Sequence, residues 1–368
     1  MKITKVEIFR ANLPLKRPFR IALGVVEVAE TMFLRLHGEN GLYGMGEANP
    51  LAPVVGETID TVLAASELCG RLVLGKNAQD IDGLTATLRA ALPHNTSARS
   101  AFDMALYDLL GKAANLPLYA LLAGSRRELM TDNTVGIDTH ETMAKHALEF
   151  AERGFPAIKV KLGTAVADDV ARIAAVRQAV GPDILLRIDA NQGWSRIDAR
   201  LALAQLAPFN IQYCEQPVKA WDIAGMAEVS AASIIPVMAD ESLFDDHDAV
   251  ALLRGDACRY FNIKLAKSGG IHTALRINAI AEGSGIACML GCMTETRLGL
   301  TAGAHFVSAR PNIKFADLDG ADMLRDDPVT GGMTYGAAGS ISLPEGAGIG
   351  ADIDADYLAV LQRIEVAG

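Results

Sequence analysis

Five ionisable residues stand at nearly even intervals in the central part of the chain. They are Lys161, Asp189, Glu215, Asp240 and Lys264, and successive members are 28, 26, 25 and 24 residues apart. One strand-and-helix unit of a βα barrel takes roughly 30 residues, since about 250 residues make eight units. Any one of the five could instead cap a helix or pair at the surface, but five in register favour equivalent places on successive strands.

The three carboxylates predict a divalent cation site. Asp189, Glu215 and Asp240 would lie on the third, fourth and fifth strands, where they would repel one another unless a cation lay between them. Ligands that are all oxygen favour Mg²⁺, which keeps positions for water or substrate. Residues expected to support this group are Asn191, Glu241 and Lys267. The alternative for the first two is a role in turns.

The two lysines indicate what chemistry the cation would serve. Lys161 would lie on the second strand and Lys264 on the sixth, so they would face each other across an eight-stranded ring. A substrate carboxylate on the cation would place its α-carbon between two ammonium groups. One lysine would then remove the α-proton and the other would return a proton to the opposite face, while Mg²⁺ stabilises the enediolate.

Lys159 precedes Lys161 by two residues, so strand alternation points both side chains the same way. A neighbouring positive charge is expected to lower the pKa of Lys161 toward the value that a base needs. The alternative is a solvated Lys-x-Lys pair on an exposed strand. The flanking Ile158, Val160 and Leu162 favour a buried strand.

The elements that would position these residues are short apolar runs separated by amphipathic stretches such as ADDVARIAAVRQAVG. Eight runs alternate with helix-like stretches at residues 131–137, 157–162, 184–190, 211–217, 235–241, 260–266, 286–292 and 313–319. Strict alternation predicts parallel βα units, and eight of them predict a closed barrel of the α/β class. Charged residues at the strand ends would face its mouth.

The residues before the barrel are expected to form a small α+β unit. Alternating strands are predicted at residues 2–14, 31–38 and 41–47, and helices at about 58–74 and 97–114. The residues after about 322 are rich in glycine and are expected to return to this first unit. The predicted division is therefore a first domain at 1–125, a barrel at 126–322 and a returning segment at 323–368.

Composition limits the partners and the compartment. A net charge of −10 argues against a nucleic-acid partner, because phosphate binding needs a basic face. No window of about 18 apolar residues predicts a membrane-spanning helix, and the alternating N-terminus MKITKVEIFRANLPL does not resemble a signal peptide. Five scattered cysteines fit reduced thiols, so a cytoplasmic location is expected.

The segments KVKLG, RIDANQGW, CEQP, MADES and NIKLAKSGG, between residues 159 and 270, resemble the enolase superfamily in its mandelate racemase/muconate lactonizing enzyme subgroup. That superfamily is the known case of a Lys or His base acting with Mg²⁺ on an ene-diolate. The resemblance extends over the whole chain. It implies a (β/α)₇β TIM-like barrel, with an N-terminal α+β capping domain completed by C-terminal residues, and the activity of an isomerase.

The last predicted strand narrows the function. Asp317 and Asp319, in FADLDG, are two residues apart and would lie across the mouth from the metal strands, where two carboxylates suit an ammonium group. An Asp-x-Asp at this place resembles the dipeptide epimerases, which hold the free amine of a dipeptide while its C-terminal residue is epimerised. The alternative is a pair that caps a loop. Thr134 matches a family position that contacts the substrate carboxylate.

One departure from the family pattern concerns the substrate side chain. Epimerases of this family that act on Ala-Glu commonly carry an arginine where Gly24 stands. Gly24 therefore predicts a larger or hydrophobic side chain, or a cationic one if Glu27 points inward, although Arg20 could still supply a positive charge. The loop at 53–56 is expected to close over the site together with the loop that contains Gly24.

Two other functions use the same residues. An N-succinylamino acid racemase or a muconate-type cycloisomerase would need the same lysines and metal, but Asp317 and Asp319 would repel their anionic substrates. A non-catalytic barrel would be expected to lack some of these residues, and all are present. The expected partner is a small-molecule dipeptide, with self-association into a homo-oligomer expected by analogy. The sequence leaves the preferred dipeptide side chains open.

Overall fold

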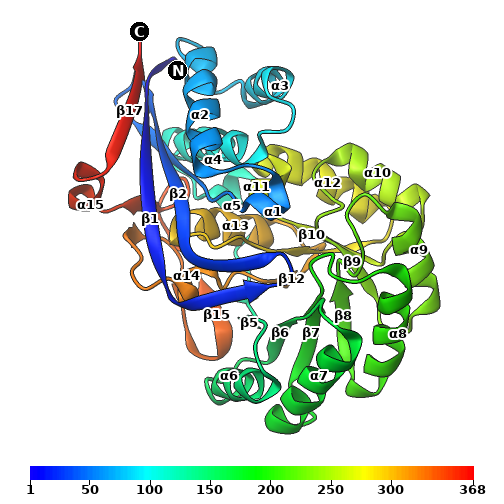
Figure 1. Cartoon of the computed structure of the whole chain (residues 1–368). Helices are drawn as coiled ribbons and strands as arrows, with labels where there is room; N and C mark the ends of the chain where they lie inside the picture. The colour runs from blue at the N-terminus through cyan, green and yellow to red at the C-terminus, as the bar shows by residue number, and fades with distance from the viewer.

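A four-stranded antiparallel sheet is built from both ends of the chain (Figure 1). The computed structural model describes all 368 residues. In sheet order the strands are β17 (Gln362–Ala367), β1 (Ile3–Ile21), β2 (Gly24–Gly38) and β3 (Tyr43–Ala48). Because β17 pairs with β1, the C-terminal residues complete the capping domain, as predicted.

Five helices follow β3 in the chain, and the second and fourth of them pack directly on the capping sheet. They are α1 (Ala52–Val55), α2 (Ile59–Val73), α3 (Ile81–Ala91), α4 (Thr96–Ala114) and α5 (Leu118–Leu121). Both predicted helices are confirmed as α2 and α4, but α3 was not predicted. Its signals were present, since Ile81, Leu84 and Leu88 form a buried stripe and the Asp80 side chain accepts a hydrogen bond from the N–H of Gly83.

The segment read from the sequence as a loop at residues 21–30 is part of an extended arm of β1 and β2. In this arm Phe19 pairs with Val26 and Ile21 with Gly24. The alternating β-branched run that contains Val25, Val26 and Val28 was the signal for strand. Figure 1 shows the arm reaching from the capping sheet across to the barrel.

Two glycines of β3 allow α4 to lie directly on the sheet. An ideal Cβ at Gly44 would lie 1.9 Å from the carbonyl oxygen of Ala105, and one at Gly46 would lie 1.9 Å from that of Ala101. These contacts are with helix backbone, which cannot move aside as a flexible side chain does. The close approach therefore requires glycine at both positions.

We predict that Gly46→Ala lowers the free energy of unfolding by about 2–3 kcal/mol, because the added methyl group forces the helix from the sheet. Urea denaturation would measure it. Gly283→Ala is the matched control, since a Cβ there has no atom within 4 Å and alanine is better than glycine in a helix by about 1 kcal/mol. Equal stabilities for the two variants would contradict the packing argument.

The barrel sheet has eight strands, each inside a run predicted from the sequence. They are β5 (Asn133–Val135), β6 (Ala157–Lys161), β7 (Leu185–Asp189), β8 (Ile211–Glu215), β9 (Val237–Ala239), β10 (Tyr260–Ile263), β11 (Ala287–Leu290) and β12 (Ile313–Ala316). All neighbouring strands are parallel. The first and last strands adjoin where the N–H of Asp132 donates to the carbonyl oxygen of Ala316 at 3.4 Å.

Seven helices follow the first seven strands, so the predicted (β/α)₇β order is confirmed. They are α6 (His140–Glu152), α7 (Val166–Val180), α8 (Arg196–Leu206), α9 (Ile223–Ala232), α10 (Asp246–Arg254), α12 (Ile271–Gly283) and α13 (Arg297–Ala309). Short helical turns are α11 (Leu265–Ser268), α14 (Gly320–Met323), η1 (Ala207–Phe209) and η2 (Ala337–Gly339). No helix combines the length and apolar character needed to cross a bilayer.

The remaining elements are short. They are β4 (Leu129–Met130), β13 (Val329–Gly331), β14 (Thr334–Tyr335), β15 (Ser340–Ser342), β16 (Ala351–Ile353) and α15 (Ala355–Ala359). β15 pairs with β4 and with β14, while β13 pairs with β16. The division of the chain near residues 125 and 322 stays a prediction.

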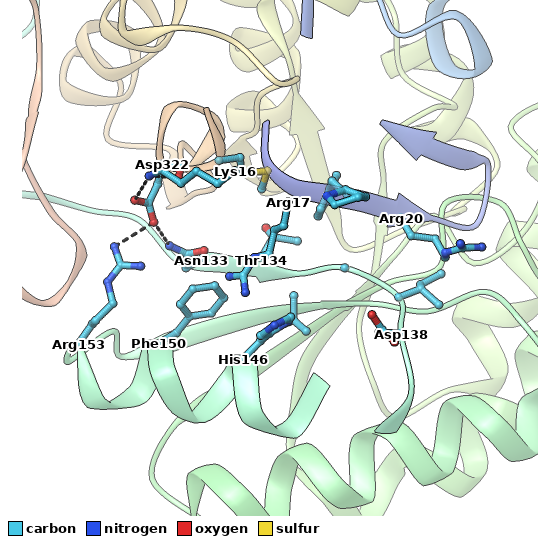
Figure 2. A pocket seen from close by; sticks show the side chains of 16 residues that line it. Lys16, Arg17, Arg20, Asn133, Thr134, Asp138, His146, Phe150, Arg153 and Asp322 are labelled. Carbon is cyan, nitrogen blue, oxygen red and sulfur yellow. Dashed lines mark hydrogen bonds and ion pairs between the residues drawn. The ribbon is translucent and has the colours of Figure 1, made fainter. Parts of the chain in front are cut away.

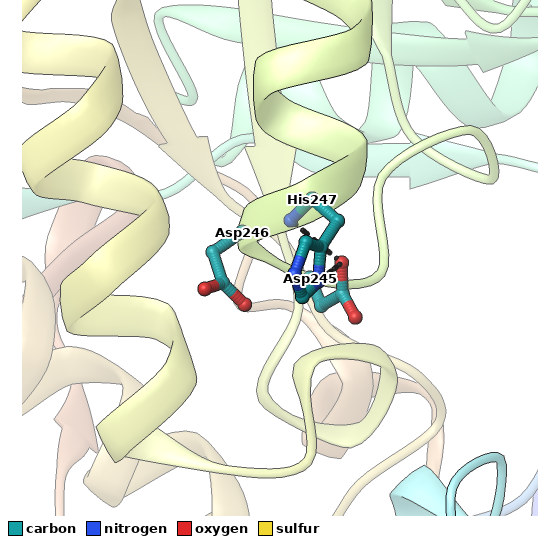
Figure 3. A group of neighbouring side chains, drawn as sticks. All are labelled: Asp245, Asp246 and His247. Atoms are coloured by element: carbon teal, nitrogen blue, oxygen red, sulfur yellow. Dashed lines mark hydrogen bonds and ion pairs between the residues drawn. The ribbon is translucent and has the colours of Figure 1, made fainter.

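Ion pairs join the capping domain to the barrel. Asp245, Asp246 and His247 lie together at the start of α10 (Figure 3), a group whose side chains could in principle hold a metal. Arg89 of α3 instead pairs with Asp245 at 2.6 Å and with Asp246 at 3.0 Å, and Arg276 also pairs with Asp246. The arginines neutralise these carboxylates, so the group serves to connect the two domains.

Candidate active site

Three carboxylates meet at the mouth of the barrel. Asp189 ends β7, Glu215 ends β8 and Asp240 follows β9 directly, and all three are fully buried. Their nearest oxygens all lie within 4.8 Å of one another. The even spacing in the sequence brings them together because the carboxyl ends of parallel strands share one rim.

Lysine side chains surround these carboxylates. The Nζ of Lys159 lies 2.8 Å from Oε2 of Glu215 and 3.3 Å from Oδ2 of Asp189. Lys161 donates to Oδ2 of Asp189 at 2.6 Å, and Lys264 donates to Oδ2 of Asp240 at 2.8 Å. Cationic groups from β6 and from the end of β10 thus contact all three carboxylates.

The carboxylates fit a magnesium ion. The buried oxygens Glu215 Oε2 and Asp240 Oδ1 are contacted by cationic groups, Lys159 at 2.8 Å and Lys267 at 2.5 Å, and neither accepts a hydrogen bond from a neutral donor. Burial and the charge of Asp189 raise the pKa of Glu215 to about 8, and a cation would favour its ionised form. A donor set of three carboxylates matches the preference of Mg²⁺ for oxygen.

The other two carboxylates are ionised more readily. Burial opposes the charge on Asp189, but Lys161 and Lys159 outweigh it and lower its pKa. Burial also opposes the charge on Asp240, where Lys264 and Lys267 prevail and lower the pKa.

Lys161 and Lys264 line one cavity, as predicted. Both are almost fully buried, at 7% and 5% exposure. Burial opposes the charge on Lys264, but Asp240 and Glu215 outweigh it and raise its pKa. Apolar side chains from the arm, from the segment around α1 and from the segments after β11 and β12 line the cavity, among them Phe19, Ile21, Val26, Leu51, Val54, Met293 and Met323. Val54 of the segment at 53–56 lines the cavity, and the closure of this segment over the site stays a prediction.

The predicted supporting residues contact the carboxylate group. Asn191 donates its backbone N–H to Oδ1 of Asp189 at 2.8 Å and its side-chain amide to Glu241 at 3.1 Å. Lys267 pairs with Asp240 and donates to the carbonyl oxygen of Leu243 at 3.1 Å. Asn262 was missed, although its amide donates to Oε1 of Glu215 at 2.7 Å. It precedes Lys264 by two residues, so strand alternation was the available signal.

The aspartate pair after β12 lies in the same cavity. Asp317 pairs with Lys159 at 2.7 Å; burial opposes its charge, but Lys159 outweighs burial and lowers its pKa to about 2. Asp319 accepts the backbone N–H of Thr134 at 2.7 Å, while burial and Asp317 raise its pKa well above the usual value. Asp319 makes no capping bond to α14, so its side chain is free of the loop-capping role that was the alternative.

Three predicted residues near the arm do not line this cavity. Arg20 is exposed and lines a neighbouring cavity. Glu27 does not point inward: it is exposed and lines a depression on the outer surface together with Val25 and Val28. Gly24 is exposed at the turn of the arm, with no atom within 4 Å of an ideal Cβ.

Comparison with known families agrees with this architecture. Residues 3–123 match the mandelate racemase / muconate lactonizing enzyme N-terminal domain, and residues 142–357 match the enolase C-terminal domain-like family. The chain therefore belongs to the mandelate racemase/muconate lactonizing enzyme family of the enolase superfamily.

Individual relatives cover nearly the whole chain. A hydrophobic dipeptide epimerase from Enterococcus faecalis is 43% identical over 95% of this chain and 99% of its own length. A D-Ala-D/L-Ala epimerase from Cytophaga hutchinsonii is 40% identical over 99% of both chains. The crystal structure of a dipeptide epimerase from Cytophaga hutchinsonii, complexed with Mg and D-Ala-L-Val, covers 100% of both chains with a TM-score of 0.98 and 40% identity.

Proposed function

We propose that the protein is a Mg²⁺-dependent isomerase that epimerises the α-carbon of the C-terminal residue of a dipeptide. The observation that carries this proposal is one cavity that holds two lysines beside three carboxylates, with Asp317 and Asp319 in the same cavity. The relatives named as dipeptide epimerases support it, since they match nearly the full length of the chain.

The two lysines transfer the proton. Lys161 comes from the second barrel strand and Lys264 follows the sixth, so they approach a substrate α-carbon from opposite sides. One removes the α-proton as a base, and the other donates a proton to the opposite face, which inverts the configuration. When bound, Mg²⁺ stabilises the negative charge that develops on the substrate carboxylate. The apolar cover from the arm and α1 excludes water from this step.

The aspartate pair holds the substrate amine. Asp317 already pairs with Lys159, whereas Asp319 forms no ion pair. The ammonium group of a dipeptide supplies the missing cation beside Asp319. An N-succinyl group or a second carboxylate would place a negative charge there instead, which disfavours the racemase and the cycloisomerase.

The preferred side chains are apolar. The cavity wall near the arm consists of Phe19, Ile21, Val26, Leu51 and Val54. Neither Arg20 nor Glu27 lines that cavity, so no charged group of the arm is available to a polar substrate side chain. Burying a charged side chain against this wall without a partner would be costly.

The test is deuterium incorporation at the α-carbon in D₂O with Mg²⁺, screened over L,L-dipeptides by mass spectrometry. We expect incorporation into the C-terminal residue of dipeptides with apolar side chains, and none into dipeptides with charged side chains. Exchange that is limited to N-acylated amino acids would overturn the proposal in favour of the racemase.

Asp319→Asn keeps the size of the side chain and removes its charge. We predict that this variant lowers kcat/KM for the best dipeptide by about 10²-fold, because removing one partner of a buried charge pair costs about 2–5 kcal/mol. The Mg²⁺ concentration that gives half-maximal activity should stay the same. A parallel loss of Mg²⁺ affinity would show instead that the aspartate pair belongs to a metal site.

The proposal includes a cytoplasmic location. All five cysteines are free thiols and four of them are buried, which fits a protein that works under reducing conditions. Association into a homo-oligomer stays a prediction.

A further inference from the structure

A second cavity, of about 300 Å³, lies beneath the arm and beside the active site (Figure 2). Residues 16–20 of β1 form its roof, and β5, α6 and α14 form the rest. Phe19, Thr134 and Met323 line this cavity and the active-site cavity. These three side chains are therefore the wall between them.

The roof is fixed at both ends. Residues 15–18 form a bulge, in which four residues of β1 stand opposite the single residue Glu27 of β2. At the N-terminal end of the roof, Leu15 pairs with Leu324. At its C-terminal end, the N–H of Ile137 donates to the carbonyl oxygen of Arg20 at 2.8 Å. The bulged segment thus spans the cavity as an arch anchored to α14 and to the end of β5.

The lower side of the cavity combines apolar and basic side chains. His146, Phe150 and Arg153 lie on one face of α6 and its C-terminal end, and Figure 2 shows all three directed toward the arm. Val135 and Ile137 of the β5 segment add two further buried side chains. The apolar part of this side therefore consists of Phe150, Val135 and Ile137.

The remaining lining is basic. Four cations, Lys16, Arg17, Arg20 and Arg153, stand against two carboxylates, Asp138 and Asp322. Burial and the charge of Arg17 lower the pKa of His146. The protein as a whole carries a net charge of −10, so this cavity has the opposite sign from the molecule around it.

Two of the arginines have little compensation. Asp322 is occupied by Arg153 at 2.9 Å, by the amide of Asn133 at 2.9 Å and by Lys16 at 3.6 Å, which closes one end of the cavity. Arg20 forms no ion pair, and Arg17 reaches only the partly exposed Glu149, at 3.8 Å. Arg17 also lies 5.8 Å from the centre of the Phe150 ring.

We propose that this cavity binds a small carboxylate that has a compact apolar body, separately from the substrate in the active site. Arg17, beside Phe150, binds the carboxylate, the positive charge of Arg20 in the same lining favours the anion, and the apolar body packs on Phe150, Val135 and Ile137. Because Phe19 and Thr134 are shared walls, occupation of one cavity changes the affinity of the other, and this coupling is reciprocal.

The test uses phenylacetate as the probe and protein treated with EDTA, so that no metal ion offers a carboxylate site among the lysines. By isothermal titration we expect a Kd of about 1 mM, the same within error in Lys161→Ala. The double variant Arg17→Gln/Arg20→Gln should weaken binding by at least about tenfold, because it removes the charge-assisted hydrogen bonds of Arg17 and the positive charge of Arg20. Arg200→Gln, on the exposed face of α8, is the matched control and should bind as the wild type does.

Crystals soaked with phenylacetate provide a measurement that needs no variant, with density expected between Arg17 and Phe150. No binding at about 20 mM probe, twenty times the expected Kd, would overturn the proposal, as would equal binding by the double variant. A double variant that alters only dipeptide turnover, with no probe bound by the wild type, would assign the arginines to the substrate site. Binding of the probe is measured without catalysis. The probe can therefore fail to bind while the proposed epimerase activity holds, and it can bind while that activity is absent.

Discussion

Replacing either Lys161 or Lys264 by alanine is expected to lower the rate of epimerisation by at least about 10³-fold, since a positioned acid or base contributes 10²–10⁴-fold. Inversion needs both faces of the α-carbon, so neither lysine can replace the other. Both side chains line the same cavity and are nearly buried. Alanine leaves a space there, and a water molecule in that space cannot act as a base at the position of the lysine nitrogen.

The two variants should differ in the proton that they still exchange. Each retains one lysine, so each should exchange the α-proton of the dipeptide with one configuration at its C-terminal residue, and the two variants should prefer opposite configurations. Deuterium incorporation into separate L,L and L,D substrates measures this. Lys145→Ala, an exposed lysine of α6, is the control and should keep full activity. Full epimerase activity in either active-site variant would exclude the two-base mechanism.

The sequence predicted the residues of the barrel mouth well because their placement follows from strand order. Asp189, Glu215 and Asp240 come at the ends of neighbouring parallel strands, and one rim collects them whatever the loops do. Contacts between distant strands were not predictable in this way. Lys159 was placed beside Lys161, but its closest partner is Asp317, which is 158 residues away in the chain and across the closure of the barrel.

The arm shows where sequence reasoning failed. Residues 15–18 add a bulge, and an inserted residue in a strand turns the following side chains to the other face. Whether Arg20 or Glu27 faces the substrate therefore depends on the register, which the residue types alone do not reveal. The structure turns Arg20 to the neighbouring cavity and Glu27 to the outer surface. A wrong register of the arm affects the predicted substrate preference most, because that preference depends on the arm.

Glu215→Gln is expected to abolish the response of the protein to Mg²⁺ while leaving the metal-free fold intact. Glutamine has the same size and can still accept the hydrogen bond that Asn262 donates to Glu215. Removing one of three mutually repelling carboxylates also relieves repulsion, and Lys159 keeps Asp317 and Asp189 as partners. The metal-free variant should therefore unfold within about 2 °C of the wild type, which corresponds to less than about 1 kcal/mol.

The difference should appear when Mg²⁺ is added. At a Mg²⁺ concentration of about 100 times its Kd, binding stabilises the wild type by about 2.7 kcal/mol and raises its melting temperature. The variant should show no such rise. Its activity should be at least about 10³-fold lower than that of the wild type. Glu152→Gln, an exposed residue of α6, is the control that should keep the rise. If Glu215→Gln kept the full Mg²⁺-dependent rise, the ion would bind elsewhere. The lysines need the positive charge of the bound ion, because that charge makes an α-proton beside a carboxylate removable. Proton transfer therefore depends on Glu215 as much as on either lysine.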